Sequence, residues 1–269
     1  MAGRAGRVRL DSELVRRGLA RSRTQAAELI AAGQVLVSGQ AAAKAATQVG
    51  QDAAITVGAP YGEPGYASRG GRKLAGALAE FADLNVRGRR CLDAGASTGG
   101  FTDVLLQAGA AHVTAVDVGY GQLAWHLRAD PRVSVLDRVN VRNLRPEQVA
   151  PPPGLVTADL SFISLTLALP ALVACAAPDA DFVLLVKPQF EVGRRQVGTG
   201  GVVRHDGLRA AAVSRVAAAA LGFGLGVRGV VASSLPGPSG NVEYFLWLQS
   251  GAPPLDDQDL RRAIEQGPR

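Results

Sequence analysis

The sequence predicts an α/β protein in which helices cover both faces of a mostly parallel sheet, preceded by a small basic α+β unit. Three observations predict this. Short apolar runs alternate with helical stretches through most of the chain, a pattern typical of parallel sheets with crossover helices. Hydrophobic residues make up 47% of the 269 residues, which is enough for a large core. A stretch rich in glycine and proline, residues 58–67, separates two segments with different patterns.

The amino-terminal segment, residues 1–60, is predicted to form two short helices followed by a small curled sheet. Ser12 is the expected cap of a helix over residues 13–17, and Ser22 with Gln25 forms a capping-box pattern at the start of the second helix. The expected strands are residues 34–37, Val49 and residues 55–57, with a tight turn at Ser38-Gly39.

Positive charge is concentrated in this segment. Residues 1–60 contain eight Lys or Arg and four Asp or Glu, so they supply most of the chain's formal net charge of +6. Such a surface is either a solvated face or a site for an anionic partner, nucleic acid or a membrane surface. The arginines that are candidates for contact with the phosphate groups of such a partner are Arg4, Arg7, Arg9, Arg16, Arg17, Arg21 and Arg23.

Residues 68–250, after a linker at residues 61–67, carry the alternating pattern. Helices are expected between most of the strands, and an antiparallel pair is expected to close the sheet. The polar segment 251–269 is expected to be a tail with a loose helix. The expected strands are residues 90–94, 113–117, 133–137, 155–159 and 182–187, with the pair at 227–232 and 242–248.

A signal peptide is not expected, because no uninterrupted apolar stretch follows the amino-terminal arginines, and a membrane helix is not expected, because no run of about 18 uncharged apolar residues is present. The protein is therefore predicted to be cytoplasmic and to have no membrane partner. Cys91 and Cys175 lie far apart in the chain and neither has a CxxC partner. Disulfides and a zinc site are not expected, and no metal is predicted.

The segment LDAGASTGGFT, residues 92–102, ends one predicted strand and begins a helix. Its glycines let backbone amides approach a ligand at the positive end of that helix. Asp117 ends the next strand, where a carboxylate can accept hydrogen bonds from both hydroxyls of a ribose. Together they predict a site for a cofactor that contains adenosine. The candidate cofactor-binding residues are Asp93, Gly95, Ala96, Ser97, Thr98, Gly99, Gly100, Phe101, Asp117, Val118 and Asp159.

Three kinds of site compete for this turn. A dinucleotide site needs glycine where the pyrophosphate approaches the backbone, and the chain has Ser97 there. The GxSxG elbow of hydrolases fits residues 95–99, but a triad needs a histidine downstream, and His205 is the one conceivable partner. S-adenosylmethionine has no pyrophosphate and tolerates serine at this position, so the residues favour this cofactor.

A known family is recognisable in eight segments that occur in order: LVRRGLARSRTQAAELI, GQVLVSG, SRGGRKL, LDAGASTGGFT, VDVGYGQL, ADLSFISL, LLVKPQFEVG and LPGPSGNVEYFLWL. Over roughly residues 5–250 the chain resembles the TlyA, or haemolysin A, family of ribosomal RNA 2′-O-methyltransferases, whose catalytic half is similar to the FtsJ methyltransferases. The resemblance implies a Rossmann-like class I methyltransferase domain, with seven strands of which one is antiparallel, after a ribosomal-protein-type RNA-binding module. It also implies S-adenosylmethionine as cofactor, ribosomal RNA or ribosomal subunits as partner, and cytidine as target.

The resemblance further implies a catalytic Lys-Asp-Lys-Glu tetrad at Lys73, Asp159, Lys187 and Glu243. The residues alone agree in part, because Asp159 and Lys187 end predicted parallel strands, where ligands of open α/β sheets bind, and Glu243 begins the last strand near that edge. Lys73 and Lys187 are two of only three lysines in the chain, and lysine can serve as a base whereas arginine cannot. Lys187 is therefore the expected general base, and the other three residues are expected to orient groups and balance charge.

Four more residues lie beside these strand ends. Phe162 and Phe190 are expected either to stack near the target base or to be core residues, and Gln189 and Asn241 either to hydrogen-bond around the site or to stabilise turns. Two other functions stay open, a membrane-active haemolysin, as the family's older name suggests, and an RNA-binding protein with a vestigial catalytic fold.

Overall fold

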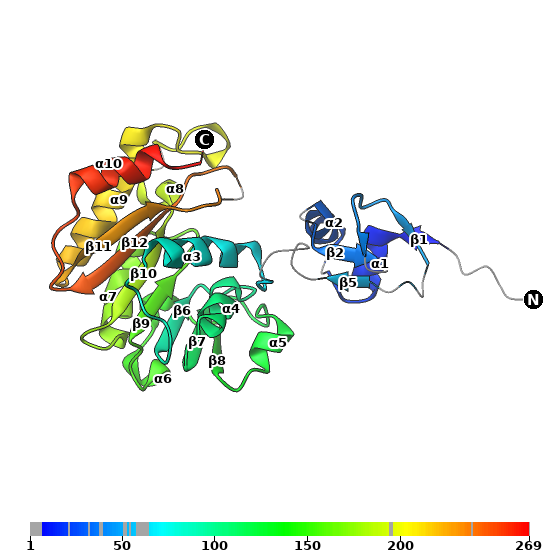
Figure 1. The fold of residues 1–269 in the computed structure, drawn as a ribbon, viewed down its shortest axis with the longest axis horizontal. Coiled ribbons are helices and arrows are strands. Elements are labelled where there is room, and N and C mark those ends of the chain that lie inside the picture. The colour runs from blue at the N-terminus through cyan, green and yellow to red at the C-terminus, as the bar shows by residue number, and fades with distance from the viewer. Residues whose placement is uncertain are drawn as a thin grey trace, which may run out of the picture. The chain divides into compact units, whose positions relative to one another are not determined.

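The computed structural model describes residues 7–20, 22–31, 33–37, 40–50, 53, 55–57, 65–193, 196–237 and 239–268. The chain divides into two compact units, residues 1–67 and residues 68–269, which are drawn in Figure 1. Each unit has a hydrophobic core of its own.

The first unit consists of two helices and short strands around a small core. Leu10 and Leu14 from the first helix pack with Ala26 and Ile30 from the second. Strand β2 pairs antiparallel with both β3 and β5, and β1 pairs antiparallel with β4. The elements are β1 (Val8–Arg9), α1 (Leu10–Arg16), α2 (Arg23–Ala31), β2 (Val35–Val37), β3 (Gln40–Ala41), β4 (Gln48–Val49) and β5 (Ile55–Val57).

The helices and strands expected in this unit are confirmed, with one correction. Ser22 Oγ accepts a hydrogen bond from the Gln25 N–H at 3.1 Å, as the capping-box pattern predicts. Helix α1, however, begins at Leu10, so Ser12 lies inside the helix and does not cap it. The Asp11 carboxylate accepts the Ser12 N–H at 2.8 Å instead. The turn expected at Ser38-Gly39 lies outside the described residues, as does most of the linker.

The second unit is a seven-stranded sheet with helices on both faces. Its helices are α3 (Arg69–Glu80), α4 (Gly100–Gln107), α5 (Trp125–Arg128), α6 (Pro146–Val149), α7 (Leu165–Cys175), α8 (Pro188–Glu191), α9 (Asp206–Leu221) and α10 (Asp257–Glu265), with the 3₁₀ turns η1 (Val141–Asn143) and η3 (Thr199–Gly201). Its strands are β6 (Arg90–Ala94), β7 (His112–Asp117), β8 (Val133–Asp137), β9 (Leu155–Ala158), β10 (Asp181–Val186), β11 (Leu225–Ala232) and β12 (Tyr244–Ser250).

The strand order is β11-β12-β10-β9-β6-β7-β8, and every neighbouring pair is parallel except the two that involve β12. This confirms the predicted mostly parallel sheet with one antiparallel strand. The order reverses direction between β6 and β9, the kind of switch point at which open α/β sheets bind ligands beyond the carboxyl ends of their strands.

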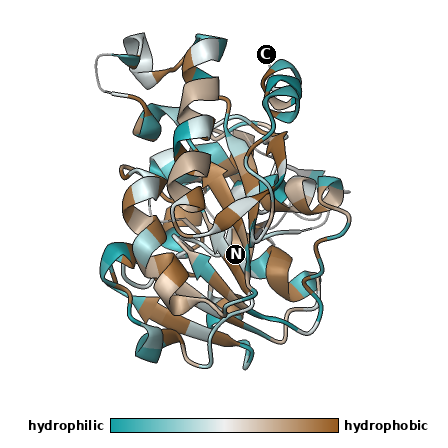
Figure 2. Ribbon diagram, turned by 90° about the vertical axis from the view of Figure 1, so that its left-hand side faces the viewer, coloured by the Kyte–Doolittle hydropathy of each residue, from teal (hydrophilic) through white to brown (hydrophobic). Residues whose placement is uncertain are grey.

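Side chains of β12 alternate between the two faces of the sheet. Tyr244, Leu246 and Leu248 belong to the core shared with α7, α9 and α10. Phe245 packs against Phe101 of α4, with ring centroids 6.0 Å apart, and Trp247 packs against Phe81 at the end of α3. Figure 2 shows the hydrophobic residues that run along the central strands. The sheet is therefore buried on both faces, as its apolar strands require.

The segment expected to be a polar tail forms helix α10 and packs on α9 and β11. Asp256 caps it by accepting the N–H groups of Gln258 and Asp259 at 2.7 and 3.1 Å. Leu260 and Ala263, spaced three residues apart on one face, are buried in the core. Leu255 and Ile264 pack partly buried against the same core, and most of the other residues of the helix are polar or charged, which explains why composition indicated a tail.

Candidate active site

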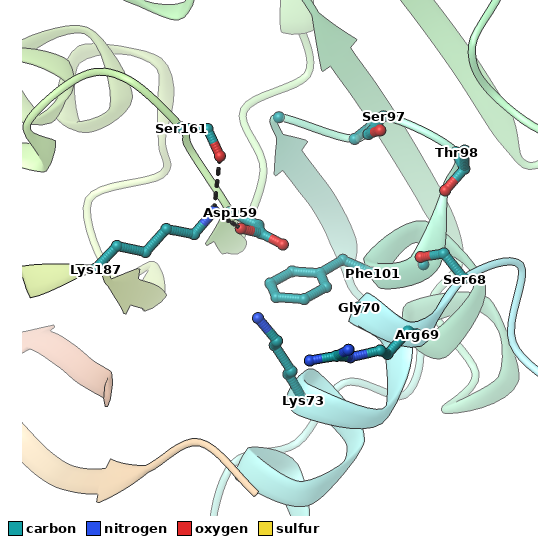
Figure 3. A pocket seen from close by; sticks show the side chains of 13 residues that line it. Ser68, Arg69, Gly70, Lys73, Ser97, Thr98, Phe101, Asp159, Ser161 and Lys187 are labelled. Carbon is teal, nitrogen blue, oxygen red and sulfur yellow. Dashed lines mark hydrogen bonds and ion pairs between the residues drawn. The ribbon is translucent and has the colours of Figure 1, made fainter. Parts of the chain in front are cut away.

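A pocket of about 250 Å³ lies beyond the carboxyl ends of β6, β9 and β10. The glycine turn after β6 and the first turn of α3 form two of its walls. Asp159 and Ser161, after β9, and Lys187, after β10, complete it. In Figure 3 the amines of Lys187 and Lys73 point into the pocket from different elements.

The predicted tetrad forms two ion pairs at this pocket. Lys187 Nζ lies 2.6 Å from Asp159 Oδ1 and donates a hydrogen bond to Ser161 Oγ at 2.9 Å. Lys73 Nζ donates to Glu243 Oε2. Lys73, Asp159 and Lys187 line the pocket, and Glu243 joins them through Lys73.

The sheet register explains how residues so far apart in sequence come together. Val186 of β10 lies opposite Tyr244 of β12. Lys187 follows Val186 and Glu243 precedes Tyr244, so the antiparallel pairing places the two residues at the same edge of the sheet. Lys73, Lys187 and Glu243 are only 6%, 9% and 1% exposed. Charged groups this buried are costly unless each has a partner of opposite charge, and the two ion pairs provide those partners.

The glycine turn is packed too closely for side chains at several positions, two of which line the pocket. A Cβ on Gly95 would lie 2.5 Å from the Asp159 carbonyl oxygen, and Gly95 has a φ of +86°. A Cβ on Gly100 would lie 2.3 Å from Ser68 Oγ, where the first turns of α3 and α4 meet. Ser97 also adopts left-handed backbone, with a φ of +47°, which serine rarely does. The turn therefore keeps a glycine-type conformation at the position where the dinucleotide motif has glycine.

The Asp117 carboxylate holds this turn in place. Its Oδ2 accepts the Ser97 N–H at 2.8 Å, and its Oδ1 accepts the Gly119 N–H at 2.7 Å. Each carboxylate oxygen has a second lone pair, so Asp117 can still accept hydrogen bonds from ribose hydroxyls. The Asp117 side chain, which is a predicted cofactor ligand, thus also stabilises the left-handed backbone of Ser97.

A second pocket, of about 1040 Å³, adjoins the first and shares Gly95, Ser97, Asp159 and Ser161 with it. This volume is at the upper end of the roughly 300–1,000 Å³ of a typical site for one small molecule, and with the smaller pocket it gives room for a cofactor and a nucleoside. The remaining lining residues are Asp117, Val118, Gln122, Asn140, Val141, Arg142, Leu160, Phe162, Ile163, Ser164, Leu167, Gln189, Phe190 and Val192.

Most of the predicted cofactor-binding residues line one of these pockets, but Asp93 and Gly99 line neither. A Cβ on Gly99 would lie 2.3 Å from Leu127 Cδ1, so this glycine makes room for a core side chain. Asp93 is completely buried behind the turn, where its Oδ2 accepts a hydrogen bond from Thr102 Oγ1 at 2.6 Å. Burial is the main cause that raises the pKa of Asp93 to about 7.

The Asp93 pKa predicts how stability depends on pH. Below about pH 4 the carboxyl is protonated in both the folded and unfolded states, and between about pH 4 and 7 only the unfolded state ionises. Raising the pH through this window therefore favours unfolding, by about 2–4 kcal/mol in total for this group. Between pH 5 and pH 8 the free energy of unfolding of the wild type should therefore fall by more than that of Asp93→Asn, as measured by urea unfolding of both proteins at both pH values. An equal change in the two proteins would contradict the assignment.

Several pocket residues were not predicted from the sequence. Asn140 follows β8, and its side chain caps η1 by accepting the Arg142 N–H at 3.0 Å. Its position beyond the carboxyl end of a parallel strand is the sequence signal that indicates this residue, because ligands of open α/β sheets bind at that edge. Ser161 and Ser68 carry no such signal, because they reach the pocket only through the path of the loop after β9 and the start of α3.

Phe162 and Phe190 lie together at the larger pocket, with ring centroids 5.3 Å apart. Phe162 is 92% exposed and has a φ of +65°, so it is not a core residue. Asn241 stabilises a loop, since it accepts the Val203 N–H at 2.8 Å and donates to the Gly201 carbonyl at 2.9 Å. Gln189 lines the larger pocket.

Four of the described arginines of the first unit are bound to two buried carboxylates. Asp11 pairs with Arg9 and Arg23, each at 2.9 Å. Glu13 pairs with Arg16 at 2.5 Å and Arg17 at 2.7 Å. The guanidinium of Arg9, above all, lowers the pKa of Asp11, and that of Arg16 lowers the pKa of Glu13 to about 2. These arginines are thus held in fixed positions and partly neutralised.

Arg7, the remaining described candidate, is exposed, and Arg4 and Arg21 lie outside the described residues. Within the described ranges, no helix is both long enough and apolar enough to cross a membrane. The same ranges contain no group of three or more His, Cys, Asp or Glu side chains placed to hold a metal ion.

Two family models match the chain. The FtsJ-like methyltransferase model matches residues 66–250, and the S4 domain model matches residues 8–55. The S4 match lies within the first compact unit, and the FtsJ-like match begins at the end of that unit, covers most of the second and by itself spans more than half of the chain.

Three similar proteins agree with these matches. The protein from Mycobacterium tuberculosis named "16S/23S rRNA (cytidine-2'-O)-methyltransferase TlyA" is 60% identical over 98% of this chain and 100% of its own length. The Brachyspira hyodysenteriae protein named "Hemolysin A" is 36% identical over 88% of this chain and 98% of its own. A solved structure from Streptococcus thermophilus, named "Putative hemolysin", is 37% identical with a TM-score of 0.77, covering 97% of this chain and 96% of that one. The chain belongs to the TlyA family, which joins an S4 domain to an FtsJ-like methyltransferase domain.

Proposed function

We propose that this protein methylates the ribose 2′-hydroxyl of a cytidine in ribosomal RNA, with S-adenosylmethionine as the methyl donor. One observation carries the proposal: the Lys187 amine and the Asp159 carboxylate form an ion pair in the same pocket that the glycine turn lines. The name of the Mycobacterium tuberculosis relative, at 60% identity, supports the choice of RNA and nucleoside.

The residues around the joined pockets fit S-adenosylmethionine. Asp117 would bind the ribose hydroxyls, the turn from Gly95 to Phe101 would hold the methionine part, and Asn140 would hold the adenine. The cradle at Gly95 and Gly100, which a Cβ would fill, supports close contact between backbone and ligand. When bound, the cofactor supplies a methyl group on a positively charged sulfur, which an oxygen nucleophile can attack.

Lys187 is proposed to take the proton of the hydroxyl as the methyl group is transferred. Ser161 accepts a hydrogen bond from its nitrogen and Asp159 forms an ion pair with it, which leaves a position on the nitrogen for the pocket. When that position carries no proton, its lone pair can accept the proton of a hydroxyl held there. The Asp159 carboxylate then stabilises the ammonium that forms.

Lys73 and Glu243 are proposed to orient the nucleotide and to balance charge. Lys73 lines the pocket and its charge is compensated by Glu243, so a cation is available to the substrate while the buried charge stays paired. Holding hydroxyl and methyl group in reactive geometry can contribute about 7 kcal/mol or more to lowering the barrier.

The Phe162–Phe190 pair is proposed to stack on the target base. Stacking of a base on an aromatic side chain contributes about 1–3 kcal/mol, and an exposed ring in left-handed backbone has no evident role in the core. Enzymes that act on one nucleotide of a folded RNA expose it from its stack, and an aromatic surface stabilises the exposed base.

The two other functions are less well supported. Membrane disruption needs no buried Lys-Asp and Lys-Glu pairs beside a glycine turn, and neither does RNA binding without catalysis. Charges buried in a fold that does not use them for chemistry would be costly to retain.

The function is tested by incubating the protein with radiolabelled S-adenosylmethionine and ribosomal subunits that lack the modification. We expect label in RNA, at a position that resists alkaline cleavage because its 2′-hydroxyl is blocked. Label on a base, label on protein, or none at all would contradict the proposal. Release of dye from liposomes at the same protein concentration would favour the haemolysin.

The S4 domain is proposed to bind the RNA through its fixed arginines. Arg9→Gln and Arg23→Gln are each expected to weaken RNA binding and to lower the slope of log affinity against log salt by about 1, because each removes one phosphate contact. Arg132→Gln is the matched control: Arg132 is 45% exposed and pairs with Asp130, much as Arg9, 44% exposed, pairs with Asp11. Equal salt slopes for all three variants and the wild type would contradict this role.

A further inference from the structure

Gln189 is a polar side chain of the larger pocket that the proposed mechanism does not use. It lies on α8, two residues after Lys187, and lines the pocket next to Phe190. Its Oε1 is buried and has no hydrogen-bond partner among the described residues. Buried polar atoms in native proteins are nearly always paired, so an unpaired amide oxygen in a pocket wall indicates a ligand that pairs with it.

Helix α8 is short, but it is firmly attached to the start of α7. Glu191 accepts hydrogen bonds from Ser164 Oγ at 2.5 Å and from the Leu165 N–H at 2.8 Å. Arg215 donates to the Glu191 carbonyl at 2.8 Å. Glu191 is only 4% exposed, and burial raises its pKa. These contacts fix the backbone that carries Gln189, while its terminal amide torsion stays soft enough to turn toward a ligand.

The neighbours of Gln189 define what that ligand is. Phe190 and Phe162, 5.3 Å apart, offer aromatic faces, and Lys187 lies at the junction with the smaller pocket. A nucleoside whose base contacts the phenyl rings and whose ribose reaches Lys187 brings the polar edge of its base close to residue 189. The volume of about 1040 Å³ leaves room for that base beside a cofactor.

We propose that the Gln189 carboxamide reads the pairing edge of the target cytosine. Oε1 accepts a hydrogen bond from the exocyclic amino group of the base, and the amide nitrogen donates to the adjacent ring nitrogen. A carboxamide offers one acceptor beside two donors, which matches the donor and acceptor of cytosine. The inference rests on the proposed function and adds the residue that selects the base.

The test combines one change in the enzyme with one in the substrate. A ribosomal RNA substrate is prepared with either cytidine or its analogue lacking the exocyclic amino group at the target position. For the wild type, removing the amino group should lower kcat/KM by about tenfold or more, because a buried acceptor is left unpaired. For Gln189→Met, which keeps the length and apolar stem of the side chain, the same removal should change kcat/KM by less than about threefold.

Gln122→Met is the matched control, because Gln122 lines the same pocket on the side of Asp117. This variant should keep the wild type's sensitivity to the amino group. Gln189→Glu, which keeps an oxygen acceptor and nearly the same shape, should also keep it while transferring more slowly to both substrates. It provides a second measurement if the methionine variant does not fold.

Equal loss on removing the amino group in the wild type and in Gln189→Met would overturn the inference. No methyl transfer by the wild type to the unmodified cytidine substrate would instead overturn the proposed function itself. The wild type and Gln189→Met should bind S-adenosylhomocysteine equally and have the same midpoint of thermal unfolding. Any difference in their response to the amino group then lies in base recognition.

Discussion

Lys187→Arg is expected to lower the rate of methyl transfer by at least about a hundredfold while leaving the affinity for the cofactor within about twofold. Arginine keeps a positive charge beside Asp159, 2.6 Å from Lys187 Nζ in the wild type, but it cannot give up its proton and so cannot serve as a base. A positioned base contributes about 10²–10⁴-fold to such a reaction. Single-turnover transfer and calorimetric titration of the cofactor measure the two quantities separately.

Lys73→Arg is the matched control for this experiment. Lys73 is also buried in the pocket wall and paired with a carboxylate, but its proposed role requires only charge. It should therefore lose much less activity than Lys187→Arg. Transfer by Lys187→Arg within threefold of the wild type would show that residue 187 acts only through its charge.

Removing one partner of the Lys73–Glu243 pair is expected to lower the free energy of unfolding by about 3–5 kcal/mol, because the other charge is left buried and unpaired. Their side chains are only 8% and 1% exposed, so water screens the pair very little. Lys73→Met and Glu243→Leu should each show this loss. The double variant should recover most of the stability, since two apolar side chains of similar volume can pack in place of the pair.

Methyl transfer should not recover in that double variant. This separation of stability from activity distinguishes a functional pair from a structural one. Urea unfolding followed by tryptophan fluorescence measures the second unit alone, because Trp125 and Trp247 both belong to it and the chain has two tryptophans. Additive losses in the double variant, or recovered transfer, would contradict the assignment.

The local patterns of the sequence were good predictors of the elements near the site. The predicted bounds of β6 and β8 match the structure, and those of β7, β9 and β10 differ by one residue at one or both ends. Alternation of apolar runs and helices is a local property, set by side-chain periodicity along one element. The start of α1 was predicted wrongly because Asp11, Ser12 and the residues around them all favour a helix start, and the contacts of Leu10 with the core decide where it begins.

Individual conformations at the site were less predictable. Ser97 is unfavourable in left-handed backbone, and hydrogen bonds from its N–H to Asp117 and from its hydroxyl to Gln122 hold it there. Asp93 looks like a cofactor ligand from its place in the motif. The structure buries it behind the turn, because a strand's side chains point alternately to opposite faces and position 93 faces Thr102 of α4.

The amino-acid sequence by itself determined the order of helices and strands, the glycine turn and the family, since each of these depends on residues close together in sequence. Tertiary structure alone decided which charges meet: Lys73 is paired with Glu243, and Lys187 with Asp159 and Ser161. It also decided that Gln189 lines a pocket with its Oε1 unpaired among the described residues, and that Asp11 and Glu13 hold four arginines. The physical reason is that distances between such side chains follow from strand order and packing, which no local pattern of residues specifies.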